Sequence, residues 1–231
     1  MVENGLQSVI EFGHKYPMQN LKPLSSPDLM KFFDLGLTEE LIVDILSDIK
    51  HRVFPRPFER LYKDRNKQGL VGIEIGVAGG EHSLSLFKTL DIKRLYCIDP
   101  YELYDGYEVG IREFGVDRAN LSDSEINARN ILTPYLDRIV WLKYLSDQAF
   151  QHINEPIDFV YIDGNHSEFW VNEDIKNYYP LVKSGGVIGG HDFFNGFAKH
   201  HSGLVKAITE FSVKNNLQLY LEVPDWWIVK P

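Results

Sequence analysis

Acidic and imidazole side chains follow two apolar runs in the second half of the chain. Asp163 comes directly after Ile157–Ile162, and His191 and Asp192 follow Val187–Gly190. If these runs are neighbouring strands, the three side chains lie together, and two carboxylates with an imidazole suit Mg²⁺, Mn²⁺ or another transition metal. The alternative is structural, with Asp163 capping the next helix and His191 bonded locally. The residue types favour the metal site.

His166 lies in the turn that follows Asp163. A single histidine in a turn is more often a surface or helix-capping residue. A position beside the candidate metal site also allows it to act as a base or to support a metal ligand without binding the metal itself. The other histidines have no such context, and we expect them to be structural or solvent-facing: His14, His51, His82, His152, His200 and His201.

Glycines cluster where an apolar run beginning at Leu70 ends. Gly76, Gly79 and Gly80 permit positive φ and close approach of the backbone to a ligand. The segment Glu81–Leu90 then carries apolar residues at helical spacing, so free N–H groups of a helix start would line the same turn. Strand, glycine turn and helix form half of a nucleotide-type site.

Three further polar residues follow expected strands. Asp99 ends the run Arg94–Ile98 and could accept hydrogen bonds from both hydroxyls of a ribose. The alternative is a turn aspartate before Pro100, but the distance from the glycine turn favours ribose. Ser146 and Asp147 follow the next run, so we expect them at the same edge.

Strands that alternate with helices predict a parallel sheet with right-handed crossovers. Ligands collect at the carboxyl ends of such strands, where all of these polar residues lie. The last two strands are separated only by Pro224 and Asp225, so they must be antiparallel. The expected strands are Val71–Val77, Arg94–Ile98, Ile139–Tyr144, Ile157–Ile162, Val187–Gly190, Leu217–Val223 and Trp226–Val229. The expected helices are Glu81–Leu90, Ser122–Leu136 with a capping box at Ser122 and Glu125, Ser167–Val182 and Gly203–Asn215.

The segments before and after the first strand and helix are harder to interpret. Prolines interrupt residues 1–27, and two helices are expected in residues 28–52, so residues 1–69 form an N-terminal helical arm that could support a homo-oligomer. Residues 101–121 carry Tyr101, Tyr104 and Tyr107 among glycines, which is consistent with a lid or with core anchors of a long loop. Trp226 and Trp227 are expected in the core.

Composition excludes several classes of protein. A net charge of -9 and a pI near 5.4 argue against a nucleic-acid partner, which needs a dense Lys/Arg surface. The chain has no long apolar stretch, so neither a signal peptide nor a membrane partner is expected, and a cytoplasmic location follows. The single cysteine, Cys97, lies in an apolar run and is expected to be an inert buried thiol.

Two sets of residues resemble a known family. The run from Glu74 to Gly80 fits the acid-x-Gly-x-x-x-Gly signature of class I S-adenosylmethionine-dependent methyltransferases, which also end in an antiparallel hairpin. The dinucleotide pattern Gly-x-Gly-x-x-Gly is absent. The segments Phe159–Ser167 and Leu181–Phe193 are similar to the "IDG-x-H" and "GGxxxxHD" segments of the small-molecule O-methyltransferase branch. The resemblance covers about Leu70 to Pro231.

The resemblance implies an α/β, Rossmann-like open sheet of order 3-2-1-4-5-7-6, mostly parallel, with helices on both faces. Residues 70–231 would be the methyltransferase domain after the 1–69 arm. The implied cofactor-binding residues are Glu74, Gly76, Gly79 and Gly80 for the methionine end of S-adenosylmethionine, Asp99 for its ribose, and Ser146 with Asp147 for its adenine side. Asp163, His191 and Asp192 match metal-ligand positions of metal-dependent relatives. Those relatives more often carry an acid where this chain has His191, so His191 is either a ligand or a base.

The expected reaction is methyl transfer to a hydroxyl of a small molecule, a sugar or a phenol, assisted by Mg²⁺ or another divalent cation. His166, His191 and Asp163 are the candidate catalytic residues. Two alternatives remain. A nicotinamide-dependent dehydrogenase could share the glycine turn and Asp99 but does not explain the hairpin. A non-catalytic module could bind S-adenosylmethionine without turnover.

Overall fold

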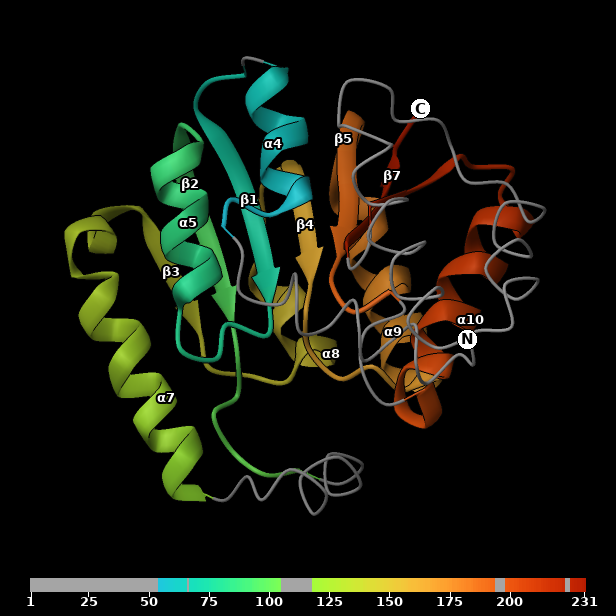
Figure 1. The fold of residues 1–231 in the computed structure, drawn as a ribbon. Coiled ribbons are helices and arrows are strands. Elements are labelled where there is room, and N and C mark those ends of the chain that lie inside the picture. Colours follow the sequence, from blue (N-terminus) through green and yellow to red (C-terminus); the bar gives the residue numbers. More distant parts are fainter. Residues whose placement is uncertain (1–53, 66, 105–117, 194–197, 223–224) are drawn as a thin grey trace, which may run out of the picture.

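The computed structural model describes residues 54–65, 67–104, 118–193, 198–222 and 225–231 (Figure 1). The two helices expected in residues 28–52, and the proposed oligomer contact there, lie outside these residues. So do His14, His51, Tyr107 and the side chains of His200 and His201. Within the described residues, no helix combines the length and apolar character needed to cross a membrane.

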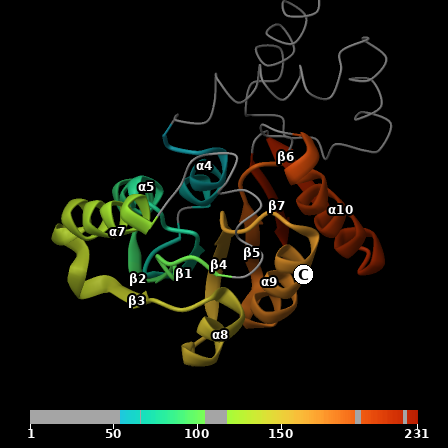
Figure 2. The same cartoon turned by 90° about the horizontal axis from the view of Figure 1, so that it is seen from below.

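A seven-stranded sheet forms the centre of the molecule, in the order β3-β2-β1-β4-β5-β7-β6, which confirms the predicted topology. β7 pairs antiparallel with both β5 and β6, and the other neighbours are parallel. Parallel strands end at one edge, at the bottom of Figure 1, and Figure 2 looks onto this edge. The strands are β1 (Leu70–Ile75), β2 (Ile92–Ile98), β3 (Ile139–Leu142), β4 (Ile157–Ile162), β5 (Val182–Gly190), β6 (Leu219–Glu222) and β7 (Asp225–Val229).

Helices cover both faces of the sheet, as predicted (Figure 2). One face packs against α8 (Ser146–Ala149), α9 (Glu168–Tyr178) and α10 (Ala198–Lys214), with Trp226 in its core. The other packs against α4 (Pro57–Asp64), α5 (Glu81–Thr89) and α7 (Arg118–Ile131), with Trp227 in its core. Both tryptophans and Cys97 are buried, as expected. Short 3₁₀ helices occupy Thr133–Arg138, Phe150–His152 and Tyr179–Leu181.

Helix α4 lies in the stretch predicted as an arm, yet it is part of the packed unit. Its side chains Phe58 and Tyr62 are 0% and 1% exposed and contact the ring of Phe159 in β4. Rings of this size contribute a large share of core stability when buried. The arginine that precedes α4, Arg56, is thereby held beside the sheet.

Several predicted boundaries were wrong. Helix α7 is already formed at Arg118, so Ser122 lies inside it and cannot form the predicted capping box. Strand β5 begins at Val182 rather than Val187, because Gly185 and Gly186 exchange backbone hydrogen bonds with Lys230 beyond β7. Gly185 has a φ of 74° and lies where the pairing of β4 with β5 shifts register, so the glycine pair bends the strand without ending it.

Candidate active site

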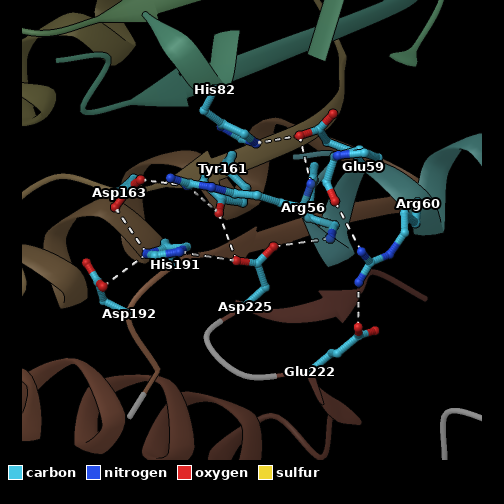
Figure 3. A network of polar contacts seen from close by, with 12 residues as sticks. Arg56, Glu59, Arg60, His82, Tyr161, Asp163, His191, Asp192, Glu222 and Asp225 are labelled. Atoms are coloured by element: carbon cyan, nitrogen blue, oxygen red, sulfur yellow. Dashed lines mark hydrogen bonds and ion pairs between the residues drawn. The ribbon is translucent and has the colours of Figure 1, made fainter. Parts of the chain in front are cut away.

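Four polar side chains meet where β4 and β5 end, and we call Asp163, His166, His191 and Asp192 the edge cluster. Nδ1 of His191 lies 3.0 Å from Oδ1 of Asp192 and 4.0 Å from Oδ1 of Asp163 (Figure 3). Nε2 of His166 lies 3.0 Å from Oδ2 of Asp192. One ligand atom from each of Asp163, His191 and Asp192 falls within 4.8 Å of the others. The predicted proximity is confirmed, and the donor set fits a divalent cation. Asp163 does not cap α9, whose N-cap is Ser167.

The backbone places these side chains with little freedom. β4 and β5 are paired so that Ile162 lies opposite Gly190, and a Cβ on Gly190 would lie 2.2 Å from the carbonyl oxygen of Ile162. Asp192 adopts a φ of 62°, in the left-handed region that aspartate tolerates better than most residues. Backbone strain of this kind is often concentrated at functional sites.

Charge in the edge cluster is shared between acids and imidazoles. Burial alone would raise the pKa of Asp192, but His166 and His191 hold it well below its usual range. Burial acts to lower the pKa of both histidines, yet Asp192 and Asp163 raise it above the ordinary value. The histidines therefore lose their protons later than free histidine as pH rises, and only then can they act as bases or metal ligands.

Arg56 reaches the edge cluster from the start of α4. One guanidinium nitrogen donates to Oδ2 of Asp163 and to the hydroxyl of Tyr161, both at 2.8 Å. That hydroxyl donates to Oδ1 of Asp225 at 3.0 Å, and the same oxygen lies 3.9 Å from Nε2 of His191 (Figure 3). Sequence reasoning missed all three of Arg56, Tyr161 and Asp225. The alternation of side chains along β4, which puts Tyr161 and Asp163 on one face, was the available signal.

The glycine turn after β1 is tightly constrained. Gly76 has a φ of 85°, and a Cβ there would lie 2.1 Å from the carbonyl oxygen of Asp163. Gly80 has a φ of 86° and forms the N-cap of α5. Gly79 also permits a positive φ but does not adopt one, whereas Ala78 has a φ of 44°. Only glycine satisfies both the turn and the close approach at Gly76.

Asp99 is bonded to the glycine turn. Oδ2 accepts from the backbone N–H groups of Val77 and Ala78, both at 3.0 Å, and Oδ1 accepts from Tyr101 at 2.9 Å. Burial raises the pKa of Asp99 despite these bonds. A carboxylate has about four acceptor positions, so the bonds are compatible with the predicted ribose contact, which stays a prediction. The hydroxyl of Tyr101 donates to Ala78, which makes Tyr101 an anchor of this loop.

A cleft runs between the glycine turn and the ends of β2, β3 and β4. It has a volume of about 120 Å³. This is below the roughly 300–1,000 Å³ of most small-molecule sites, so a nucleoside-sized ligand requires the lining to open. Oδ1 of the neighbouring Asp147, in α8, has no hydrogen-bond partner among the described residues. The lining residues that matter below are Gly76, Asp99, Ser146, Asp163, Trp170 and Asp174.

A second polar group lies inside the protein, and we call Glu59, Glu74, His82, Ser83 and Ser85 the inner cluster. Oε1 of Glu74 lies 3.0 Å from Nδ1 of His82, and its Oε2 accepts a hydrogen bond from Ser83. Ser85 donates to Glu59 at 2.7 Å. Glu74, predicted to hold the cofactor, is 1% exposed and lies beneath the turn rather than on its surface. The expectation that His82 is structural agrees with its burial, and His152 stacks on Tyr144.

Comparisons with known proteins bear on this arrangement. Residues 73–193 match a family model described as a methyltransferase domain. No curated protein matches the chain significantly. Among solved structures, the O-methyltransferase NovP has a TM-score of 0.54 at 18% identity, over 80% of this chain and 78% of NovP.

Two other solved structures are also similar to this chain. A Clostridium thermocellum protein assigned as an rRNA methylase has a TM-score of 0.53 at 15% identity, over 74% of this chain and 92% of its own. The methyltransferase MycE of mycinamycin biosynthesis, in complex with Mg, S-adenosylhomocysteine (SAH) and mycinamycin VI, has a TM-score of 0.50 at 16% identity, over 90% of this chain and 63% of MycE. At these identities the likeness shows a common fold.

Proposed function

Because the chain belongs to the methyltransferase domain family, we propose that it transfers a methyl group from S-adenosylmethionine to a hydroxyl of a small molecule, a sugar or a phenol. The observation that carries the proposal is the edge cluster beside the cleft. Asp163 belongs to both, so a hydroxyl held at Asp163 would lie next to a ligand in the cleft.

The cofactor would occupy the cleft. Gly76, Gly79 and Gly80 would face its methionine end, Asp99 its ribose, and Ser146 with Asp147 its adenine. Glu74 has both carboxylate oxygens bonded inside the protein, so we assign it to supporting the turn. When bound, S-adenosylmethionine supplies a methyl group already activated on sulfur. The protein then has to align the acceptor oxygen with that methyl group and remove its proton.

The edge cluster contains the residues that would remove the proton from the acceptor hydroxyl. A divalent cation held by Asp163, His191 and Asp192 would lower the pKa of an acceptor hydroxyl. The complex of the structural neighbour MycE contains Mg. His166, held by Asp192, would accept the proton as the oxygen–methyl bond forms and the sulfur–methyl bond breaks. Because a protonated imidazole cannot accept a proton, activity should increase with pH as His166 loses its proton.

A binding and transfer experiment tests the proposal. The full chain is titrated with SAH by calorimetry, and methyl-labelled S-adenosylmethionine is then assayed with sugars and phenols in Mg²⁺ or EDTA. We expect SAH to bind, and EDTA and Asp163→Asn to reduce transfer at least tenfold. Full activity of Asp163→Asn after chelation would overturn the metal role. Binding without transfer to any acceptor would support the non-catalytic module, and tighter binding of NAD than of SAH would support a dehydrogenase.

A nucleic-acid acceptor is the less favoured reading, although one structural neighbour is assigned as an rRNA methylase. The net charge of -9 opposes contact with a phosphate backbone. Adding structured RNA to the same assay tests this reading directly, and we expect no incorporation of label above background.

A further inference from the structure

Asp174 is a buried acid that the proposed function does not use. It lies on α9, is 1% exposed and lines the cleft beside Ser146. Its Oδ1 has no hydrogen-bond partner in the part of the chain that the structure describes. Burial raises the pKa of Asp174 to about 7, against the lowering effect of a hydrogen bond with Ser146. A buried carboxylate oxygen without a donor is costly, and a ligand that brings a donor removes the cost.

An aromatic side chain stands next to this carboxylate. Trp170 lies one helical turn before Asp174 on α9, so both project from the same face of the helix, and both line the cleft. The ring of Tyr104 meets Trp170 edge to face with centroids 5.4 Å apart, which holds the indole in place. The indole and Asp174 therefore line the same cleft, and Oδ1 of Asp174 becomes accessible to a ligand when the lining opens.

We propose that Asp174 reads the exocyclic amino group of the cofactor's adenine while Trp170 packs against the purine ring. The inference rests on the proposed function, since it deepens the same cofactor site. It places the base on the β3 side of the cleft, beside Ser146. A carboxylate there accepts a hydrogen bond from the amino group of adenine and repels the keto oxygen of hypoxanthine.

The test compares SAH with S-inosylhomocysteine, in which a keto oxygen replaces the amino group. Calorimetric titration of the full chain at pH 8.5, where Asp174 is ionised, should show the inosine compound binding at least tenfold more weakly, since a lost hydrogen bond to a charged group costs about this much or more. In Asp174→Ala and in the isosteric Asp174→Asn the ratio of the two dissociation constants should fall to within about threefold of one. The alanine lacks the acceptor, and the amide can turn either its oxygen or its nitrogen toward the base.

A purely structural role for Asp174, holding Ser146 at the start of α8, would weaken both compounds equally. The matched control is Asp158→Asn at the opposite end of β4, where the carboxylate accepts from Val71 and Lys183; it should keep the wild-type ratio. Equal binding of the two compounds by the wild type, or an unchanged ratio in both Asp174 variants, would overturn the inference. Failure of the wild type to bind SAH at all would instead overturn the proposed function beneath it.

Discussion

The edge cluster and the inner cluster contain the same kinds of residue but differ in how their charges are balanced. Burial lowers the pKa of His82 to about 3 in the inner cluster, whereas Asp192 and Asp163 raise the pKa of His166 and His191 at the edge. Burial likewise raises the pKa of Glu74 to about 8. Glu74 and His82 in the inner cluster are therefore mostly uncharged near pH 7, whereas the edge cluster holds separated charges.

Exposure and donors explain the difference. Serine hydroxyls donate to both glutamates of the inner cluster, and these glutamates are at most 1% exposed. The edge cluster borders the cleft through Asp163, whose side chain is 19% exposed. A polar group that is bonded and sealed contributes to stability, while one that faces a cleft can exchange protons or bind ligands. The same residue types are thus structural in one place and available for chemistry in the other.

Asp192→Asn should cause the largest loss of activity. A small loss would contradict the contrast between the edge cluster and the inner cluster. The amide keeps the side-chain shape and tolerates the left-handed backbone, but it removes the charge that faces His166 and the proposed metal. We expect methyl transfer to fall on the order of a hundredfold or more. The midpoint of thermal unfolding should move by only a few degrees. Activity within tenfold of wild type would show that the edge cluster is structural too.

Arg56 connects the two clusters, because it bonds Asp163 through its side chain and Glu59 through its backbone N–H group. Arg56→Met leaves the partly buried Asp163 and the buried hydroxyl of Tyr161 without this donor, so we expect urea unfolding to show a loss of about 3 kcal/mol. Arg60→Met on the same helix is the control. Its ion pair with Glu222 is more exposed, and its loss should cost about 1 kcal/mol or less. Equal losses of stability in the two variants would mean that the ion pair of Arg56 contributes no more than an exposed ion pair.

Ser85→Ala tests the inner cluster alone. It removes the donor to Glu59 and should cost about 1–3 kcal/mol, because a buried carboxylate oxygen is left without that bond. The dissociation constant for SAH, measured at a temperature where the variant is folded, should not change. Ser122→Ala, at an exposed position of α7, should change neither quantity. A weaker affinity for SAH in Ser85→Ala would show that the inner cluster reaches the cleft.

The sequence was sufficient for the meeting of Asp163 with His191 and Asp192, which follows from where apolar runs end, whereas the sheet order followed from the resemblance to a known family. The sequence was not sufficient to predict which residues contact these three side chains. Arg56 and Asp225 reach the site only through the packing of α4 and the hairpin against β4 and β5, which no local pattern encodes. Glu74 belongs to a motif, yet its orientation depends on Ser83 and His82. The different charge states of the inner cluster and the edge cluster therefore depend on which residues pack around each group, and not on the residue types within it.

Glu74→Gln should have the smallest effect on function, and the pH dependence of its stability sharpens the comparison of the two clusters most. With a pKa near 8, folded Glu74 is protonated at pH 6.5, whereas the unfolded carboxyl, with its ordinary pKa of 4.5, is ionised. Glutamine mimics the protonated form without the cost of taking up a proton on folding, so Glu74→Gln should be more stable than the wild type at pH 6.5 by about 2–3 kcal/mol. The unfolded chain has already released this proton, so wild-type stability should decline relative to the variant between pH 6.5 and 8, by at most about 1.4 kcal/mol per pH unit.

His82, with a pKa near 3, affects the comparison of wild type with Glu74→Gln only below pH 6.5, where its unfolded form gains a proton and stability falls with falling pH. Urea unfolding of both proteins across pH 6.5 to 8 therefore isolates Glu74. The affinity for SAH should stay within about threefold of wild type, because both carboxylate oxygens are bonded inside the protein. Parallel pH curves together with a tenfold loss of affinity would return Glu74 to the cofactor site, as its motif predicts, and would make the inner cluster part of the binding machinery.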